Sequence, residues 1–269
     1  MPEPAFGGWS FHRTRREVDR VGRALAVGPL DDADTAVLEE FVAYCLDVLD
    51  VVVDQLSLSG RVLVPRQKNL NTIREKIQRE GLKLSQIQDI VGCRHVMAEH
   101  ETRLDQRRIV DEFISSLSDF RPRIVDRIRD PRQGYRAIHI IAKARGIEVE
   151  IQVRTHYQHA WAQVYEWLGD LMGRGIRYGA GIDADRVPLR HLVECESLLR
   201  IGHDLARHVD SYEMAVDRID EVRLMGIDPG SGWIERLAET KVTLLLALDE
   251  FGQAAAELDA RLNAEDHAP

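Results

Sequence analysis

Hydrophobic residues recur at helical spacing near the start of the chain. The spacing is regular over 34–56 and predicts an amphipathic helix, with Asp34 or Asp32 as its N-cap. A weaker pattern predicts a first helix over 13–26. Residues 1–12 carry Pro, Gly and aromatic side chains without any period, and they are predicted to form a loose or docked arm.

From about residue 60 the pattern changes to short β-branched runs that alternate with helical stretches. Pro65 is predicted to close the first strand, because proline cannot donate to a strand ladder. This alternation indicates an α+β fold, a mixed sheet with helices packed on it. Strands are predicted over 60–66, 87–98, 123–128, 136–143 and 147–154, and helices over 69–81 and 102–118.

After residue 155 the sequence shows only helical patterns. A helix is predicted in the segment "HAWAQVYEWLGDLM", followed by a flexible Gly-rich loop over 173–182. Two long helices are predicted over 188–222 and 231–263, separated at the segment "DPGS". The predicted organisation is an N-terminal arm with helices over 1–58, a sheet domain over 59–183, and a C-terminal helical extension over 184–269.

The composition is that of an ordinary globular protein, with 44% hydrophobic and 30% charged residues among 269. A net charge of −9 disfavours a general nucleic-acid binder. No apolar run reaches membrane-spanning length, and the first residues lack the apolar core of a signal peptide. Three separated cysteines without a CxxC pair fit a reducing compartment and argue against a zinc ribbon. We therefore expect a cytoplasmic protein without membrane contact.

The strand predicted over 147–154 has one charged face. Apolar residues alternate there with Glu150, Gln152 and Arg154, which therefore share a side. Such a face is either functional or belongs to a solvated edge strand. The edge-strand alternative predicts that Glu150→Gln changes little.

A basic cluster stands out in this acidic chain. Arg66, Lys68, Arg74 and Lys76 lie within eleven residues. Alone, such a cluster is most often a solvated helix face. In a chain of negative net charge it is also a candidate polyphosphate site.

Other segments add carboxylates and an aromatic ring. Asp89 and Arg94 flank an otherwise apolar strand, where a charge must be edge-exposed, paired or metal-bound. Asp89 and Glu150 could together hold Mg²⁺, which prefers carboxylate and phosphate oxygens. Gly134 permits a tight turn, and Tyr135 is either a packing residue or a platform for a base. The combination indicates phosphoryl-type transfer between two nucleotides.

Several common motifs are missing or incomplete. The sequence has no GxxxxGK[ST] phosphate loop, and "GRGIRYG" has the wrong spacing for a dinucleotide fingerprint. His156 and His159 lie one helical turn apart without a third ligand nearby, which favours hydrogen bonding or phosphate contact. The His203-Asp204 pair has no further His and Asp residues at a suitable spacing, which indicates that it lies on a helix surface.

Five segments together resemble a known family. "RQKNLNTIREK", "IQDIVGCR", "DPRQGYRAIH", "VEIQVRT" and "QHAWA" occur in the order found in the synthetase domain of RelA/SpoT-type alarmone synthetases, especially the small single-domain ones. The resemblance implies a nucleotidyltransferase-like mixed sheet and a GTP pyrophosphokinase-type transferase. Such an enzyme transfers the β,γ-pyrophosphate of ATP to the 3′-hydroxyl of GDP or GTP, with Mg²⁺, and makes (p)ppGpp.

The resemblance also implies roles for individual residues. Two arginines would flank the ATP adenine, basic residues would lie near its phosphates, and carboxylates would bind Mg²⁺ or deprotonate the attacking hydroxyl. An aromatic ring would stack on the acceptor base. By position, the ATP-binding residues are Arg66, Lys68, Arg74, Lys76 and Arg94; the catalytic and metal-binding residues are Asp89 and Glu150; the acceptor-binding residues are Tyr135, Arg132, Arg136, His139, Gln152 and Arg154.

The sequence departs from the family pattern mainly on the acceptor side. Thr72 replaces a usual Ser and keeps the hydroxyl, and Arg132 replaces a usual Lys. Gln163, Tyr165 and Glu166 stand where many members have Glu, a second Glu and His. The resemblance therefore leaves the identity of the acceptor open.

Two other functions remain as alternatives. A toxin-type relative would pyrophosphorylate adenosine nucleotides or the tRNA 3′ end and would be held by an antitoxin. A catalytically silent nucleotide-binding module is the other, although it would not need both Asp89 and Glu150. The C-terminal helices are expected either to pack on the core or to mediate homo-oligomer or antitoxin contacts.

Overall fold

The computed structural model describes residues 8–266, which form two compact units. Each unit is assembled from segments that are separated in the sequence. The sheet unit comprises residues 8–96, 108–126 and 138–153, and the helical unit comprises residues 97–107, 127–137 and 154–266.

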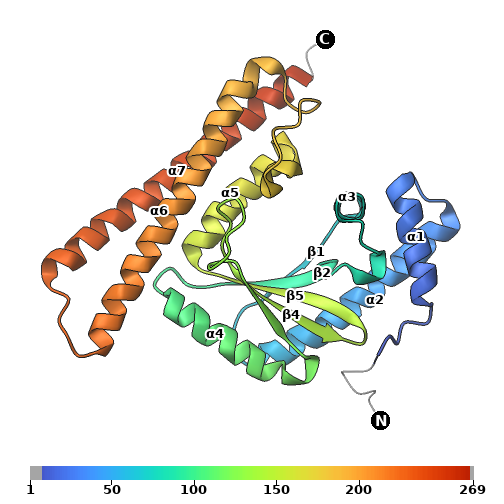
Figure 1. Cartoon of the computed structure of the whole chain (residues 1–269), viewed down its shortest axis with the longest axis horizontal. Coiled ribbons are helices and arrows are strands. Elements are labelled where there is room, and N and C mark those ends of the chain that lie inside the picture. The colour runs from blue at the N-terminus through green and yellow to red at the C-terminus, as the bar shows by residue number, and fades with distance from the viewer. Residues whose placement is uncertain (1–7, 267–269) are drawn as a thin grey trace. The chain divides into compact units, whose positions relative to one another are not determined.

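A five-stranded sheet is the centre of the sheet unit (Figure 1). Its strand order is β1-β2-β5-β4-β3, with antiparallel pairing of β1 to β2, β3 to β4 and β4 to β5. Gly92 lies beside Glu150, and the Met97 amide donates to the Arg154 carbonyl, so β2 and β5 run parallel. The sheet is therefore mixed, and the predicted α+β class is confirmed. The strands are β1 (Val64–Gln67), β2 (Val91–Val96), β3 (Arg123–Asp126), β4 (Ile138–Ala144) and β5 (Ile147–Arg154).

The charged strand β5 occupies the middle of this sheet, between β2 and β4. Val149, Ile151 and Val153 are fully buried, as their alternation predicts. The solvated edge-strand alternative for β5 is therefore wrong. A two-residue turn at Arg145 and Gly146 joins β4 to β5. Both residues have positive φ, and turns of this kind match the right-handed twist of the strands that they connect.

Strand β1 is an edge strand, and its position explains why the prediction for Pro65 was wrong. Pro65 was predicted to close the first strand, but it lies inside β1 and is paired in register with Cys93. Proline is tolerated there because an edge strand leaves one side of its ladder unpaired.

Capping side chains and a glycine mark the ends of helices in the sheet unit. They are α1 (Arg15–Val27), α2 (Asp32–Ser57), α3 (Leu70–Glu80) and the later part of α4 (Arg103–Ser116). The N-cap of α2 is Asp31, whose carboxylate accepts the Asp34 amide, so the prediction of Asp34 or Asp32 was wrong. Asp34 forms an ion pair with Arg20 instead. Gly81 ends α3 in the left-handed conformation.

The start of the described chain docks on α2. Trp9 and Phe11 pack against Phe41, and Phe11 also stacks on Tyr44. The Tyr44 hydroxyl donates to the carbonyl of Arg145, which ties α2 to the β4–β5 turn. The predicted arm is thus docked over residues 8–12, and residues 1–7 lie outside the described part.

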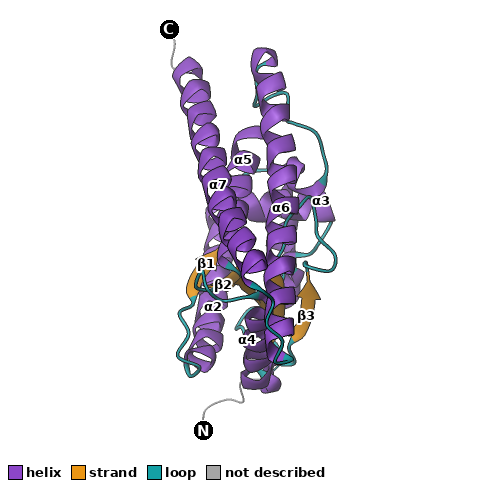
Figure 2. Cartoon of the chain, turned by 90° about the vertical axis from the view of Figure 1, so that its left-hand side faces the viewer, coloured by secondary structure: helices purple, strands orange, loops and turns teal. Residues whose placement is uncertain are grey.

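The helical unit is built mainly from α5 (His156–Met172), α6 (Leu192–Leu224) and α7 (Ser231–Asp266). Figure 2 shows α6 and α7 running side by side as long helices. Trp161, Leu198, Phe251 and Leu258 are among the residues of their shared core. The Gly-rich segment expected to be a flexible loop contains a short 3₁₀ helix, Arg174–Tyr178. Within residues 8–266, no strand follows Arg154 and no helix is long and apolar enough to cross a membrane.

Candidate active site

Two lysines clamp Asp89 in the sheet unit. Lys76, on α3, places Nζ 2.7 Å from Oδ1 of Asp89, and Lys68, just after β1, places Nζ 3.2 Å from Oδ2. The Lys68 amide also donates to the carbonyl of Ile90, which fixes the chain beside β2. Burial alone would lower the pKa of Lys76, but the negative charge of Asp89 outweighs it and the pKa is raised. The sheet unit therefore holds fixed positive charge at this position.

Glu150 on β5 is a second, half-buried carboxylate. His139 on β4 places Nδ1 3.0 Å from Oε1, and Gln152 donates Nε2–H to Oε2 at 2.6 Å. Burial alone would raise the pKa of Glu150. His139, the Gln152 hydrogen bond and the charge of Arg66 together outweigh burial, so the pKa is lowered. Glu150 is thus ionised at neutral pH.

Gln152 links this carboxylate to two arginines. Its Oε1 accepts from Arg66 at 2.8 Å and from Arg94 at 3.4 Å, while its amide nitrogen donates to Glu150. Arg66 comes from β1, Arg94 from β2, Gln152 and Glu150 from β5, and His139 from β4. Four strands thus bring five of the predicted site residues into one hydrogen-bonded group.

Gly92 sets the spacing between β2 and β5, and its role was missed from the sequence. A Cβ on Gly92 would lie 2.3 Å from the carbonyl oxygen of Glu150. Real Cβ atoms do not approach this closely, so any other residue would displace β5. In the sequence, Gly92 is only a glycine inside an otherwise apolar run.

Arg74 contacts helix α1. Its Nε donates to the carbonyl of Leu25 at 2.9 Å, and Nη2 donates to that of Gly28 at 3.3 Å. These carbonyls end α1, where the helix dipole favours a cation. Arg74 therefore anchors α1 to α3, and its predicted role near the ATP phosphates stays a prediction.

In the helical unit, a tight turn presents Tyr135. Gln133 and Gly134 both have positive φ, and Arg132 pairs with Tyr135 across the turn. The guanidinium of Arg154 lies 4.9 Å from the Tyr135 ring centroid, and Nη2 donates to the phenol oxygen at 3.0 Å. Arg132 is exposed on the turn.

The unusual residues of α5 have structural partners. Glu166 pairs with Arg154 at 2.9 Å, so a carboxylate balances a guanidinium that is only 1% exposed. Tyr165 stacks on Trp161, and its hydroxyl lies 3.1 Å from His203 Nε2 on α6. Gln163 is exposed. Of the three departures on α5, Glu166 therefore pairs with Arg154, Tyr165 packs against α6, and Gln163 faces solvent.

Arg136 is turned toward α6. It donates to Asp210 Oδ2 at 3.0 Å, to the Ala206 carbonyl at 3.2 Å and to the Gly134 carbonyl at 3.1 Å. Its predicted role in binding the acceptor stays a prediction, as do those of Tyr135, Arg132 and Arg154.

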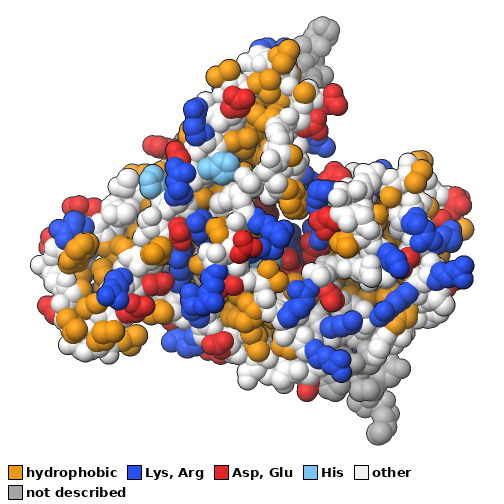
Figure 3. Space-filling model, in the orientation of Figure 1, with side chains coloured by type: hydrophobic (Ala, Val, Ile, Leu, Met, Phe, Trp, Pro, Cys, Tyr) orange, Lys and Arg blue, Asp and Glu red, His pale blue; other side chains and the backbone are white. Residues whose placement is uncertain are grey.

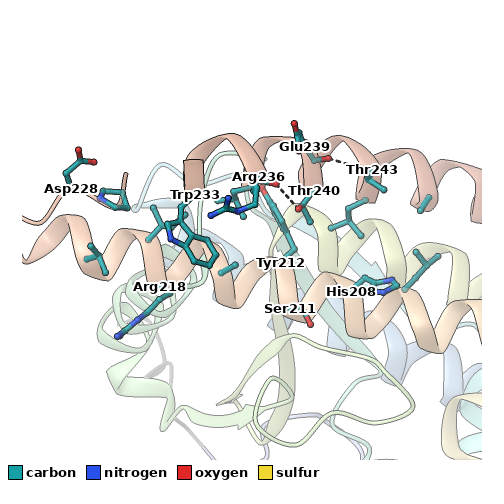
Figure 4. Close-up of a pocket in the computed structure, with 18 residues that line it drawn as sticks. His208, Ser211, Tyr212, Arg218, Asp228, Trp233, Arg236, Glu239, Thr240 and Thr243 are labelled. Atoms are coloured by element: carbon teal, nitrogen blue, oxygen red, sulfur yellow. Dashed lines mark hydrogen bonds between the residues drawn. The ribbon is translucent and has the colours of Figure 1, made fainter. Parts of the chain in front are cut away.

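A groove between α6 and α7 has a volume of about 1050 Å³, but it does not suit a nucleoside triphosphate (Figure 4). Its walls are mainly apolar and include Ile219, Val222, Trp233, Leu237 and Leu244. Its two arginines do not converge on a ligand, because Arg218 pairs with Glu221 and Arg236 lies over the Trp233 ring, whereas the sheet unit gathers two lysines at Asp89.

Part of this chain is similar to known proteins. Residues 65–167 match the model of the region found in RelA / SpoT proteins. An uncharacterized protein of Mycobacterium tuberculosis is 35% identical over 179 residues, covering 63% of this chain and 62% of that protein. A probable GTP diphosphokinase of rice chloroplasts (Oryza sativa subsp. japonica) is 29% identical over 127 residues, covering 46% of this chain and 18% of that protein.

A solved structure also resembles this chain. The small alarmone synthetase 1 of Bacillus subtilis bound to pppGpp is 20% identical, with a TM-score of 0.48, and the match covers 69% of this chain and 98% of that one. The chain spans less than two thirds of the curated relatives that it matches. Residues 65–167, which include Arg66, Asp89 and Glu150, are similar to the region found in RelA / SpoT proteins, and we call them the RelA/SpoT-type region.

Proposed function

We propose that this protein is an ATP-dependent pyrophosphokinase that transfers the β,γ-pyrophosphate of ATP to the 3′-hydroxyl of GDP or GTP and makes (p)ppGpp. The observation that carries the proposal is the group of carboxylates and cations gathered in the RelA/SpoT-type region. Glu150 is ionised and half-buried, Asp89 is held by two lysines, and Gln152 joins Arg66 and Arg94 to Glu150.

The donor ATP is assigned to the sheet unit. Arg66 and Arg94 flank the adenine in this proposal, since planar guanidinium groups stack on purines. Lys68 and Lys76 neutralise the phosphates, and their ammonium groups are already gathered at one point by Asp89.

Mg²⁺ is the proposed cofactor. Asp89 and Glu150 supply the carboxylate oxygens that this cation prefers. Within residues 8–266, no group of three or more His, Cys, Asp or Glu side chains could hold a metal ion. Two carboxylates therefore suit a cation that is completed by ATP phosphate oxygens and water, and such a cation would stabilise the charge on the phosphates.

Glu150 is the proposed general base. Its ionised Oε atoms can accept the proton of the 3′-hydroxyl, while His139 and Gln152 hold the carboxylate in place. The 3′-oxygen then attacks the β-phosphorus, a new P–O bond forms, and the bond to the α-phosphate oxygen breaks to release AMP. Positioning and charge stabilisation supply most of the acceleration in such reactions.

The acceptor base is assigned to Tyr135, whose ring orientation is fixed by Arg154. A guanine nucleotide is the first candidate. Adenosine nucleotides or the tRNA 3′ end, as in a toxin-type enzyme, are the alternatives. Figure 3 shows acidic and basic side chains interspersed over the face that it displays, whereas tRNA binding favours a broad basic surface.

A transfer assay tests the proposal. Purified protein with Mg²⁺ and γ-labelled ATP is offered GDP, GTP, AMP, ADP or deacylated tRNA, and products are separated by thin-layer chromatography. Label on a guanine nucleotide, lost in Glu150→Gln, supports the proposal. Glu148→Gln is the matched control, because Glu148 lies on the same strand and pairs only loosely with Arg123. Label on another acceptor supports a toxin-type enzyme, and no transfer at all supports a silent module.

Assembly through the C-terminal helices, as a homo-oligomer or with an antitoxin, stays a prediction. Large apolar side chains are exposed on α6 and α7, and Trp233 at the groove is 63% exposed. Light scattering of wild type and Trp233→Glu would test whether this surface joins subunits. A cytoplasmic location also stays a prediction.

A further inference from the structure

The helical unit contains a cluster of buried polar side chains outside the groove and outside the catalytic strands. These residues come from the first turn of α4, the start of α5 and the middle of α6. The most deeply buried members are Arg103, Gln106, Thr155, Gln158 and Glu213. Polar groups are retained in a core only when each finds a partner, so their partners indicate what the cluster fixes.

Glu213 on α6 fixes the start of α5. Its Oε2 accepts from Arg103 at 2.8 Å and from Gln158 at 3.0 Å, and its Oε1 accepts from the Thr155 hydroxyl. Thr155 and Gln158 form the capping box of α5. Thr155 directly follows Arg154, so Glu213 holds the backbone next to the guanidinium that orients Tyr135.

Asp210, one turn earlier on α6, fixes the other side of Tyr135. Its Oδ2 accepts from Arg136 at 3.0 Å, and its Oδ1 accepts from Arg103. Arg103 therefore bridges Asp210 and Glu213, and the two carboxylates act as one network. Arg136 is the residue immediately after Tyr135.

The turn itself rests on the same helix. A Cβ on Gly134 would lie 2.7 Å from the Ala206 side chain and 3.1 Å from Trp161. The residues on both sides of Tyr135 are thus held by α6, Gly134 through packing and Arg136 through Asp210 and the Ala206 carbonyl.

We propose that Asp210 and Glu213 are positioning residues for acceptor binding, so that α6 completes the acceptor-binding part of the enzyme although it lies outside the RelA/SpoT-type region. The inference rests on the proposed function insofar as Tyr135 receives the acceptor base. Neither carboxylate touches the substrate. They act through Arg136, Thr155 and Arg154, which set the position of the Tyr135 ring.

The test compares Asp210→Asn and Glu213→Gln with wild type. Asp204→Asn is the matched control, because Asp204 lies on the same helix and pairs with Arg207 on the exposed surface. The expected result is a rise of about tenfold in the KM for the acceptor nucleotide, the size of a lost charge-assisted hydrogen bond, with an unchanged KM for ATP. Asp210→Glu, which keeps the charge, is expected to recover part of the acceptor affinity.

A direct binding measurement separates this inference from the proposed reaction. Calorimetric titration with GDP and with a non-hydrolysable ATP analogue needs no turnover. Weaker GDP binding by Asp210→Asn, with intact binding of the ATP analogue, supports the inference even if wild type transfers no pyrophosphate. Equal losses for both nucleotides, unchanged binding of both, or no GDP binding by wild type overturn it. Thermal melting identifies a variant that fails to fold, and Asp210→Asn is the safer variant because Asp210 is 27% exposed.

Discussion

Replacing Gly92 with alanine provides the sharpest test of how the sheet positions its carboxylate. The added Cβ would meet the Glu150 carbonyl oxygen at 2.3 Å, whereas ordinary contacts begin near 3.4 Å. The two strands must therefore separate by about 1 Å or the backbone must distort, and overpacking of this kind costs about 1–3 kcal/mol in the free energy of unfolding. Because Glu150 belongs to the strand that moves, its carboxylate would also be displaced.

The expected consequence is larger for activity than for stability. A loss of 1–3 kcal/mol lowers the melting temperature by about 2–10 °C in a protein of this size. A displacement of about 1 Å in a catalytic group can lower the rate by about 100-fold. Thermal unfolding followed by circular dichroism measures the first effect, and pyrophosphate transfer well below the melting temperature measures the second.

Gly28→Ala is the control for Gly92→Ala. A Cβ on Gly28 would meet nothing within 4 Å, and its φ of −174° suits any residue. If Gly92→Ala melts within 1 °C of wild type and transfers pyrophosphate at the wild-type rate, the close approach of β2 to Glu150 has no functional importance and the reasoning fails.

Three further changes have distinct expected outcomes. Lys76→Gln leaves Asp89 with one lysine and should raise the KM for ATP by about tenfold or more, without changing the KM for the acceptor. Arg74→Gln removes two hydrogen bonds to α1 and should lower the melting temperature by a few degrees; a raised KM for ATP with unchanged melting would instead assign Arg74 to ATP binding. Asp217→Asn should flatten the pH dependence of stability. Burial raises the pKa of Asp217 from 3.8 to about 6, partly offset by Arg103. The folded state therefore binds more protons between these values, and the free energy of unfolding falls as pH rises from about 4 to about 6, by about 1 kcal/mol after allowance for partial exposure.

Two of these changes have a comparison that excludes indirect effects. Lys83→Gln removes an exposed lysine near the end of α3 and should leave both KM values unchanged. The Asp217 result is read from chemical denaturation at pH 4, 6 and 8, where wild type should lose stability between the first two values and the variant should not. Equal curves for the two proteins would show that Asp217 titrates with an ordinary pKa.

The sequence predicted what depends on local periodicity. Strand β5 was predicted over 147–154 and is observed there, because strict alternation of apolar and polar residues over eight positions fits a strand and not a helix. The end of α3 was also placed correctly, because Gly81 is a strong stop signal. The N-cap of α2 was missed by one residue, since three of its first candidate positions carry aspartate and only the backbone geometry selects Asp31.

Contacts between distant segments left no local signal. Arg103 and Asp210 are separated by 107 residues, and nothing in the pattern around either one indicates the other. Gly92 looks like any strand glycine until β5 is placed beside it. The residues that bear charge could therefore be named from the sequence, but the contacts of Gly92 with Glu150 and of Arg103 with Asp210 could not.

The chain crosses between the sheet unit and the helical unit five times, at residues 96–97, 107–108, 126–127, 137–138 and 153–154. Neither unit is a continuous stretch, so no single truncation yields either one intact. During synthesis on the ribosome, the sheet cannot acquire its central strand until residue 153 has emerged. Until then β2 and β4, the two neighbours of β5, lack their shared partner strand, so this stage of translation exposes unpaired strand edges that can pair with other chains.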